Sequence, residues 1–179
     1  MNYDDDPPFA VGRYREMQKA FPGADALYRL ARAQLETALP QGGSVLIIGA
    51  GGGREIEALA ASRCGFALTG VDPSADMIAL ARRHADAAGA GAVALIQGRA
   101  ADVAPPPGGF DAATGFLVMH FLTDDDGPDG KAAHLRAIRA RLRPGARYLH
   151  ADIAFDGPDE QAATTPVFLR HAALAGLSD

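Results

Sequence analysis

The stretch SVLIIGAGGGREIEALA, from Ser44 to Ala60, joins an apolar run to a helical pattern through four glycines within five residues. Read as the dinucleotide fingerprint G-x-G-x-x-G, it carries Arg54 where the third glycine belongs. No Gly-Lys-Ser/Thr follows, so a P-loop is excluded. The pattern that fits is G-x-G-x-G, formed by Gly49, Gly51 and Gly53. The free backbone amides of such a turn can receive a carboxylate as well as a phosphate, so the stretch predicts a strand, a ligand-binding turn and a helix.

Length and composition restrict the class of protein. The chain has 179 residues, 48% of them hydrophobic and 22% charged, which is typical of one globular domain. A net charge of -5 argues against a nucleic-acid partner. No apolar stretch approaches the ~20 residues that span a bilayer, so we expect no membrane partner. Cys64 is the single cysteine and the acidic N-terminus is no signal peptide, which together favour a cytoplasmic location.

The pattern along the chain predicts an α/β fold. Strands are expected at 44–49, 66–71, 92–97, 110–118 and 146–153, with helical patterns between them. Most of these runs are continuously apolar, as in parallel strands covered on both faces, so we expect a doubly wound, mostly parallel sheet. Residues 1–23 read as an N-terminal arm that Pro22 and Gly23 separate from a domain over 24–179.

Two aspartates follow predicted strands. Asp72 is expected at the tip of the second strand, where a carboxylate can accept two hydrogen bonds from a ribose diol. It could instead cap the next helix, but Ser74 is better placed for that role. Asp102 follows the third strand, and it reads equally well as an acceptor for an adenine amine and as a solvated loop residue.

Five segments in order, 45–60, 68–84, 98–103, 110–122 and 135–152, resemble the class I S-adenosylmethionine-dependent methyltransferases. The resemblance runs from about residue 24 to about residue 155, and the layout is also similar to the carboxy-S-adenosylmethionine synthase group. It implies a Rossmann-like sheet, S-adenosylmethionine as cofactor with S-adenosylhomocysteine as product, and a small-molecule substrate. The cofactor-binding residues that it implies are Gly49, Ala50, Gly51, Gly53, Asp72, Pro73, Met77, Ala101, Asp102, Phe116 and Leu117.

The sequence departs from the family pattern at three places. Ile47 stands where the family commonly has an acidic residue, so backbone carbonyls or Glu55 must substitute in receiving the methionine ammonium. The target-nitrogen motif of amino-methyltransferases is missing after the fourth strand, and Asp6–Phe9 (Asp-Pro-Pro-Phe) lies in the arm without a leading strand. Only one helix follows the fifth strand, so we expect a sheet without the last two of the usual seven strands. Its edge would be covered by a second copy, in a homodimer, or by a helix over 165–177.

His120, directly after the fourth strand, is the candidate catalytic residue. It can orient a substrate or act as a base, or it can simply be a satisfied histidine at a helix start. The five histidines show no zinc-ligand spacing, so no metal site is expected. Tyr3, Phe9, Tyr14 and Phe21 can form a lid over the methyl group or pack the arm. Two other functions stay open at this point, a nonenzymatic S-adenosylmethionine-binding or dimerisation module and an NAD-dependent oxidoreductase, which the arginine after the glycine turn disfavours.

Overall fold

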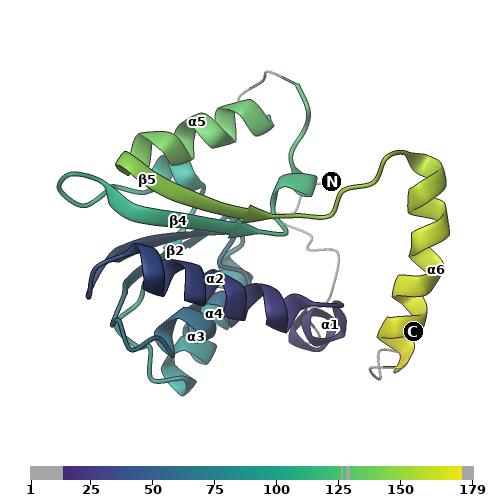
Figure 1. Cartoon of the computed structure of the whole chain (residues 1–179), viewed down its shortest axis with the longest axis horizontal. Helices are drawn as coiled ribbons and strands as arrows, with labels where there is room; N and C mark the ends of the chain where they lie inside the picture. Colours follow the sequence, from purple (N-terminus) through teal and green to yellow (C-terminus); the bar gives the residue numbers. More distant parts are fainter. Residues whose placement is uncertain (1–13, 126, 128–129, 175–179) are drawn as a thin grey trace.

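Strands and helices alternate along residues 14–125, 127 and 130–174, the part of the chain that the computed structural model describes (Figure 1). Within these residues five strands form one sheet, six α-helices accompany it, and two short 3₁₀ helices follow the third and fourth strands. In chain order the elements are α1 (Tyr14–Ala20), α2 (Ala24–Ala38), β1 (Ser44–Ile48), α3 (Arg54–Ala60), β2 (Ala67–Asp72), α4 (Ala75–Ala87), β3 (Ala94–Gln97), η2 (Ala100–Asp102), β4 (Phe110–Phe116), η3 (Met119–Phe121), α5 (Lys131–Arg141), β5 (Leu142–Ala151) and α6 (Pro158–Leu174).

The strand order in the sheet is β3-β2-β1-β4-β5, and every neighbouring pair is parallel. The order reverses between β1 and β4, which makes this the topological switch point of a doubly wound sheet. Ile47 in β1 is flanked by Gly70 of β2 and Thr114 of β4. The predicted Rossmann-like fold is therefore confirmed, and among the described residues the sheet has no sixth or seventh strand.

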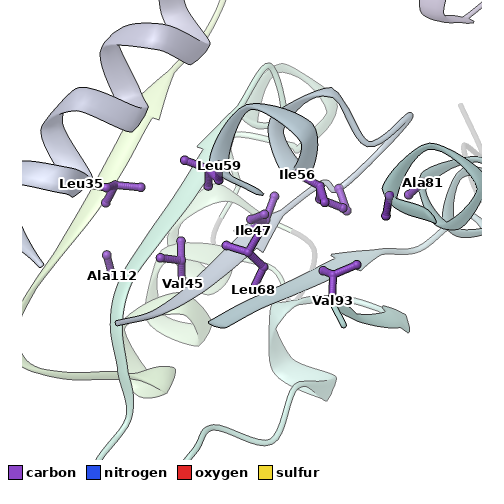
Figure 2. Close-up of a cluster of buried hydrophobic side chains, with 11 residues drawn as sticks. Leu35, Val45, Ile47, Ile56, Leu59, Leu68, Ala81, Val93 and Ala112 are labelled. Atoms are coloured by element: carbon purple, nitrogen blue, oxygen red, sulfur yellow. The ribbon is translucent and has the colours of Figure 1, made fainter. Parts of the chain in front are cut away.

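Helices cover both faces of the sheet. Figure 1 shows α2, α3 and α4 on one face and α5 on the other. Figure 2 shows the core on the first face, where Ile47 lies among side chains of these three helices and of the strands. On the second face Ile138 of α5 packs against Leu46 and Ile48. Each fully buried aliphatic side chain of this kind contributes about 1.5–3 kcal/mol, so β1, buried on both faces, is the centre of the fold.

Helix α4 begins as the sequence predicts. Ser74 is its N-cap, and the Ser74 hydroxyl accepts a hydrogen bond from the Met77 amide at 3.4 Å. A serine in this position satisfies one of the amides that the first helical turn leaves unpaired. Because Ser74 caps the helix, the carboxylate of Asp72 can serve the turn on the other side of the strand tip.

The last strand and the last helix begin earlier than predicted. Strand β5 pairs first at Leu142 with Phe110, and then resumes at Arg147 with Ala112, so residues 143–146 form an irregular insertion around Pro144-Gly145. Helix α6 begins at Pro158 and continues through Pro166. It packs on the N-terminal helix through Phe168, whose ring centroid lies 5.3 Å from that of Phe21, and Figure 1 shows it beyond the end of β5 rather than along the strand. Within the described part of the chain, no helix is both long enough and apolar enough to cross a bilayer.

Candidate active site

A cavity of about 600 Å³ opens at the carboxyl ends of the strands, beside the switch point. Its wall comes from the β1–α3 turn, the tips of β2, β3 and β4, and the two N-terminal helices. Ligands bind at this position in open α/β sheets, because the strand order reverses there and leaves a crevice. The predicted site residues that line it are Gly49, Ala50, Gly51, Asp72, Pro73, Met77, Phe116, Leu117 and His120.

The glycines of the β1–α3 turn divide between the cavity and the core. Gly49 and Gly51 line the cavity, and Gly49 has φ 67°, in the left-handed region that other residues rarely adopt. A Cβ on Gly49 would lie 2.5 Å from Cγ2 of Val118. Gly53 lies outside the cavity wall, and a Cβ there would lie 3.1 Å from Cα of Ala81 in α4. Gly53 therefore serves the close packing of α3 on α4 rather than contact with a ligand.

Asp72 ends β2 and holds the glycine turn in place. One carboxylate oxygen accepts from the Gly51 amide at 2.9 Å, and the other accepts from the Ser74 amide at 3.0 Å. The residue is only 9% exposed. A carboxylate at this strand tip is the group that accepts hydrogen bonds from a ribose diol in dinucleotide folds.

The structure does not bring Ala101 and Asp102 to the cavity wall. The Asp102 carboxylate accepts from the Arg99 amide at 2.8 Å and caps its own 3₁₀ turn. The carbonyl of Ala101 is bonded to the guanidinium of Arg141. Arg99 and Ala100 line the cavity at this strand tip instead. Sequence spacing placed the strand tip correctly, but it could not show which way the short turn directs its side chains.

The tip of β4 has an unusual backbone. Leu117 has φ 59°, and it is the only non-glycine residue with positive φ in the described part of the chain. Its amide donates to the Ala151 carbonyl of β5 at 2.9 Å, and Phe116 packs on Tyr28 with ring centroids 6.2 Å apart. Conformations of this kind cost about 1–3 kcal/mol and collect at functional sites. The strain fits the placement of Leu117 in the cavity wall.

His120 is paired with an acid that the sequence did not single out. Its Nδ1 lies 2.6 Å from Oδ1 of Asp152, which follows β5, and Oδ2 of Asp152 accepts from the His120 amide at 3.1 Å. Burial works to raise the pKa of Asp152, but hydrogen bonds from His120 and from two backbone amides outweigh it and lower the pKa. The ionised carboxylate can only accept, so the neutral ring carries its proton on Nδ1 and keeps Nε2 as an acceptor. The signal available in the sequence was an aspartate near the end of the expected fifth strand, 146–153, which pairs with the strand that precedes His120.

Two aromatic residues of the N-terminal segment line the cavity. The Tyr14 hydroxyl would lie 3.3 Å from a Cβ on Gly51, so the ring covers the glycine turn. Burial raises the pKa of Tyr14 to about 12, with a further contribution from the charge of Asp72. Arg54 fastens this segment, because its guanidinium donates to the Gln18 carbonyl at 2.7 Å and pairs with Asp25. Phe21 lies in the same wall, whereas Tyr3, Phe9 and Asp6–Phe9 fall outside the described residues.

Of the two substitutes that the sequence left open for the acid missing at Ile47, one, Glu55, lies on α3. Ile47 is fully buried in the apolar cluster under the helices. Glu55 lines the cavity at the start of α3 and is 6% exposed. Of the residues described, no group of three or more histidines, cysteines and acids could hold a metal ion.

A parallel doubly wound sheet, with a glycine turn tied to an acid at the next strand tip, defines a Rossmann-like domain built to hold a nucleoside-bearing ligand. The chain belongs to the methyltransferase domain family, whose model matches residues 45–146, more than half of its length. The predicted resemblance to class I methyltransferases is thereby confirmed. A search among curated proteins found no match.

Several solved structures share the fold. A putative S-adenosylmethionine-dependent methyltransferase of Methanococcus maripaludis is 18% identical, with a TM-score of 0.69 over 95% of this chain and 73% of that chain. A methyltransferase of Geobacter sulfurreducens in complex with S-adenosylhomocysteine is 22% identical, with a TM-score of 0.58 over 76% of this chain and 53% of that one. Phosphoethanolamine N-methyltransferase 2 of Haemonchus contortus, in complex with S-adenosylmethionine, is 18% identical, with a TM-score of 0.69 over 98% of this chain and 43% of that one. The chain thus spans about half the length of the latter two proteins.

Proposed function

We propose that this protein is an S-adenosylmethionine-dependent methyltransferase that acts on a small molecule. The observation that carries the proposal is one cavity that joins a glycine turn, a carboxylate at the tip of β2 and a histidine–carboxylate pair beyond β4 and β5. The family match and the complexes of the Geobacter and Haemonchus proteins with S-adenosylhomocysteine and S-adenosylmethionine support the same cofactor. Arg54 stands where the dinucleotide fingerprint needs its third glycine, and the family match points to another cofactor. Both observations argue against an NAD-dependent oxidoreductase.

The cavity residues fit this cofactor. Asp72 is buried at the tip of β2, where a carboxylate can accept hydrogen bonds from a ribose diol, and Gly49 and Gly51 line the cavity with backbone alone. Pro73, Met77, Phe116 and Leu117 provide apolar wall beside them. When bound, S-adenosylmethionine supplies a methyl group already activated by its sulfonium. The protein's task is then to align the acceptor and exclude water, which needs little further chemistry.

His120 is the candidate acid–base group. Asp152 holds the ring so that Nε2 can take a proton from an acceptor hydroxyl or amine in the cavity. The side chain of His120 is 30% exposed, so a proton received there can pass to solvent. Asp152 is a positioning residue, because it touches the histidine and the backbone rather than the acceptor.

The N-terminal arm, residues 1–23, is proposed as the lid of a methyltransferase domain over 24–179. Tyr14 over the glycine turn and Phe21 in the cavity wall support this division. The roles of Ala101 and Asp102 in cofactor binding, the carboxy-S-adenosylmethionine synthase variant and the cytoplasmic location stay predictions from the sequence.

A homodimer through the edge of β5 belongs to the same proposal. Within the sheet β5 pairs only with β4, and two exposed apolar residues, Ile153 and Phe155, follow it. An open strand edge is a template for pairing with another chain. Sedimentation velocity should show the mass of two 18.5-kDa chains, whereas a monomer across the concentration range would remove the dimer from the proposal.

The experiment for the activity is detection of S-adenosylhomocysteine formed from S-adenosylmethionine over a panel of small amines, alcohols, phenols and carboxylic acids. We expect product with at least one class and none without acceptor. Tight cofactor binding with no product from any class would instead favour the nonenzymatic binding module.

A further inference from the structure

Glu55 is a buried carboxylate in the cavity wall that the protein itself leaves unsatisfied. It is the second residue of α3, two residues beyond Gly53, and it is 6% exposed. Its Oε1 has no hydrogen-bond partner in the described part of the protein. Burial raises the pKa of Glu55 to about 8, and the Thr114 side chain offsets the rise only in part, the pair falling outside hydrogen-bond geometry. Buried polar groups in proteins are normally hydrogen-bonded, so an unpartnered carboxyl oxygen in a cavity wall points to a ligand that pairs with it.

No cation of the described residues provides that partner. The groups that face Glu55 are the Thr114 hydroxyl on β4 and the phenols of Tyr28 on α2 and Tyr148 on β5. Arg54 precedes Glu55 in sequence, but its guanidinium is engaged by the Gln18 carbonyl and the Asp25 carboxylate. A cation that pairs with Glu55 in its ionised form would therefore be supplied by a ligand in the cavity.

The pairing of β1 with β4 shows where the Glu55 carboxylate lies relative to Ile47, the position at which the family commonly has an acidic residue. Thr114 is the β4 partner of Ile47 in the sheet. Since Glu55 interacts with Thr114, helix α3 brings a carboxylate beside the position that Ile47 leaves apolar. The turn that precedes Glu55 is the one expected to receive the amino-acid part of the cofactor.

We propose that Glu55 binds the ammonium group of the cofactor's amino-acid part and so replaces the acid missing at Ile47. The inference rests on the proposed function, because it takes S-adenosylmethionine as the ligand. The sequence left two substitutes open for the missing acid, a backbone carbonyl or Glu55. Because the Glu55 carboxylate is buried and unpaired, we favour Glu55. Binding requires Glu55 to be ionised, so the proton it holds at neutral pH leaves when the cofactor enters.

The test compares two ligands and two variants by calorimetric titration. S-adenosylhomocysteine carries the ammonium, whereas 5′-methylthioadenosine keeps the nucleoside and the sulfur and lacks the amino acid. E55Q should weaken S-adenosylhomocysteine about 10-fold to 100-fold, the loss of one charge-assisted hydrogen bond, and leave 5′-methylthioadenosine unchanged. The control E36Q removes an exposed carboxylate of α2 and should change neither affinity.

The outcomes separate this inference from the proposed function. Equal losses for both ligands, or no loss for either, would overturn the role of Glu55 while leaving cofactor binding intact. Failure of the wild-type protein to bind either ligand would overturn the proposed function itself. A second measurement needs no variant, since titrations at pH 6.5 in buffers of different ionisation enthalpy report proton release. Release of most of a proton with S-adenosylhomocysteine and none with 5′-methylthioadenosine supports the inference, and equal release contradicts it.

Discussion

Two aspartates do similar work at the carboxyl ends of two strands, β2 and β5. Asp72 accepts from the amides of Gly51 and Ser74, so it ties the glycine turn to the start of α4. Asp152 accepts from the amide and ring of His120, so it ties the histidine to the end of β5. Each carboxylate fixes the geometry of a group that faces the cavity, and each is held in turn by the rigid sheet behind it.

Replacing Asp152 by asparagine should lower the turnover number about 10²–10⁴-fold, the usual contribution of a general base. An asparagine amide can donate to Nδ1 of His120, which would move the ring proton to Nε2 and remove the acceptor from the cavity. The measurement is steady-state turnover beside the affinity for S-adenosylhomocysteine, which should stay within about twofold because Asp152 is outside the proposed cofactor contacts.

His120→Ala should show the same division between turnover and affinity, and His171→Ala is the matched control, since His171 is exposed on α6. If D152N and H120A turn over at the wild-type rate, the pair has no part in proton transfer. A parallel loss of cofactor affinity would mean that Asp152 acts only by holding the strand tips together.

For single residues, the sequence predicted the site correctly where a residue's role follows from its place at the end of a strand. Asp72 and His120 were predicted from their positions after strands, and both line the cavity. Asp102 was placed by the same reasoning, but its carboxylate closes its own turn. The pairing of His120 with Asp152 joins residues 32 apart, and spacing alone does not determine such contacts.

The glycine turn is where elements meet most closely. Gly53 has φ 82° and caps α3, and its Cα approaches the backbone of Ala81 in α4. This is the close helix packing that the third glycine provides in dinucleotide folds, although here it lies one position earlier in the motif.

Gly53→Ala should therefore lower the free energy of unfolding by about 2–5 kcal/mol. About 1–2 kcal/mol of this comes from the left-handed backbone, and about 1–3 kcal/mol from the contact with Ala81. Gly89→Ala is the matched control, because Gly89 has φ 72° and a Cβ there meets nothing within 4 Å. Urea unfolding gives both values, and equal losses in the two variants would contradict a packing role for Gly53.

Elements with strong apolar patterns were predicted closely and those at the edge less so. The expected first strand, 44–49, differs from β1 by one residue, because its side chains are buried on both faces. The start of β5 was missed, since a Pro-Gly pair is typical of turns, whereas this strand accommodates Pro144 and Gly145 in an insertion after Leu142. Helix α6 begins at Pro158, before the expected 165–177, and it continues through Pro166 although a proline inside a helix usually breaks it.

The buried Glu55 should affect how the free energy of unfolding of the whole protein depends on pH. The folded protein holds a proton on Glu55 up to about pH 8, whereas an unfolded chain releases it near pH 4.5. The unfolded state therefore binds fewer protons in this window, and the free energy of unfolding falls as the pH rises from about 4.5 to about 8.

E55Q should lack this fall, so its stability relative to the wild type should increase with pH between 5 and 8. The difference between the two proteins is the quantity to measure, by urea unfolding without ligand, because burial lowers the pKa of His84 and His134 and these groups act in the opposite direction. Parallel pH profiles for the two proteins would show that Glu55 is ionised in the free protein.

At the largest scale, we infer that the cavity at the switch point holds a nucleoside cofactor without a pyrophosphate. The turn has no third fingerprint glycine at position 54, and the family match supports S-adenosylmethionine. Calorimetric titration of the wild-type protein with S-adenosylhomocysteine and, separately, with NADH tests this most directly. We predict saturable binding of S-adenosylhomocysteine and at least tenfold weaker binding of NADH, and the reverse order, or no binding of S-adenosylhomocysteine, would contradict the account.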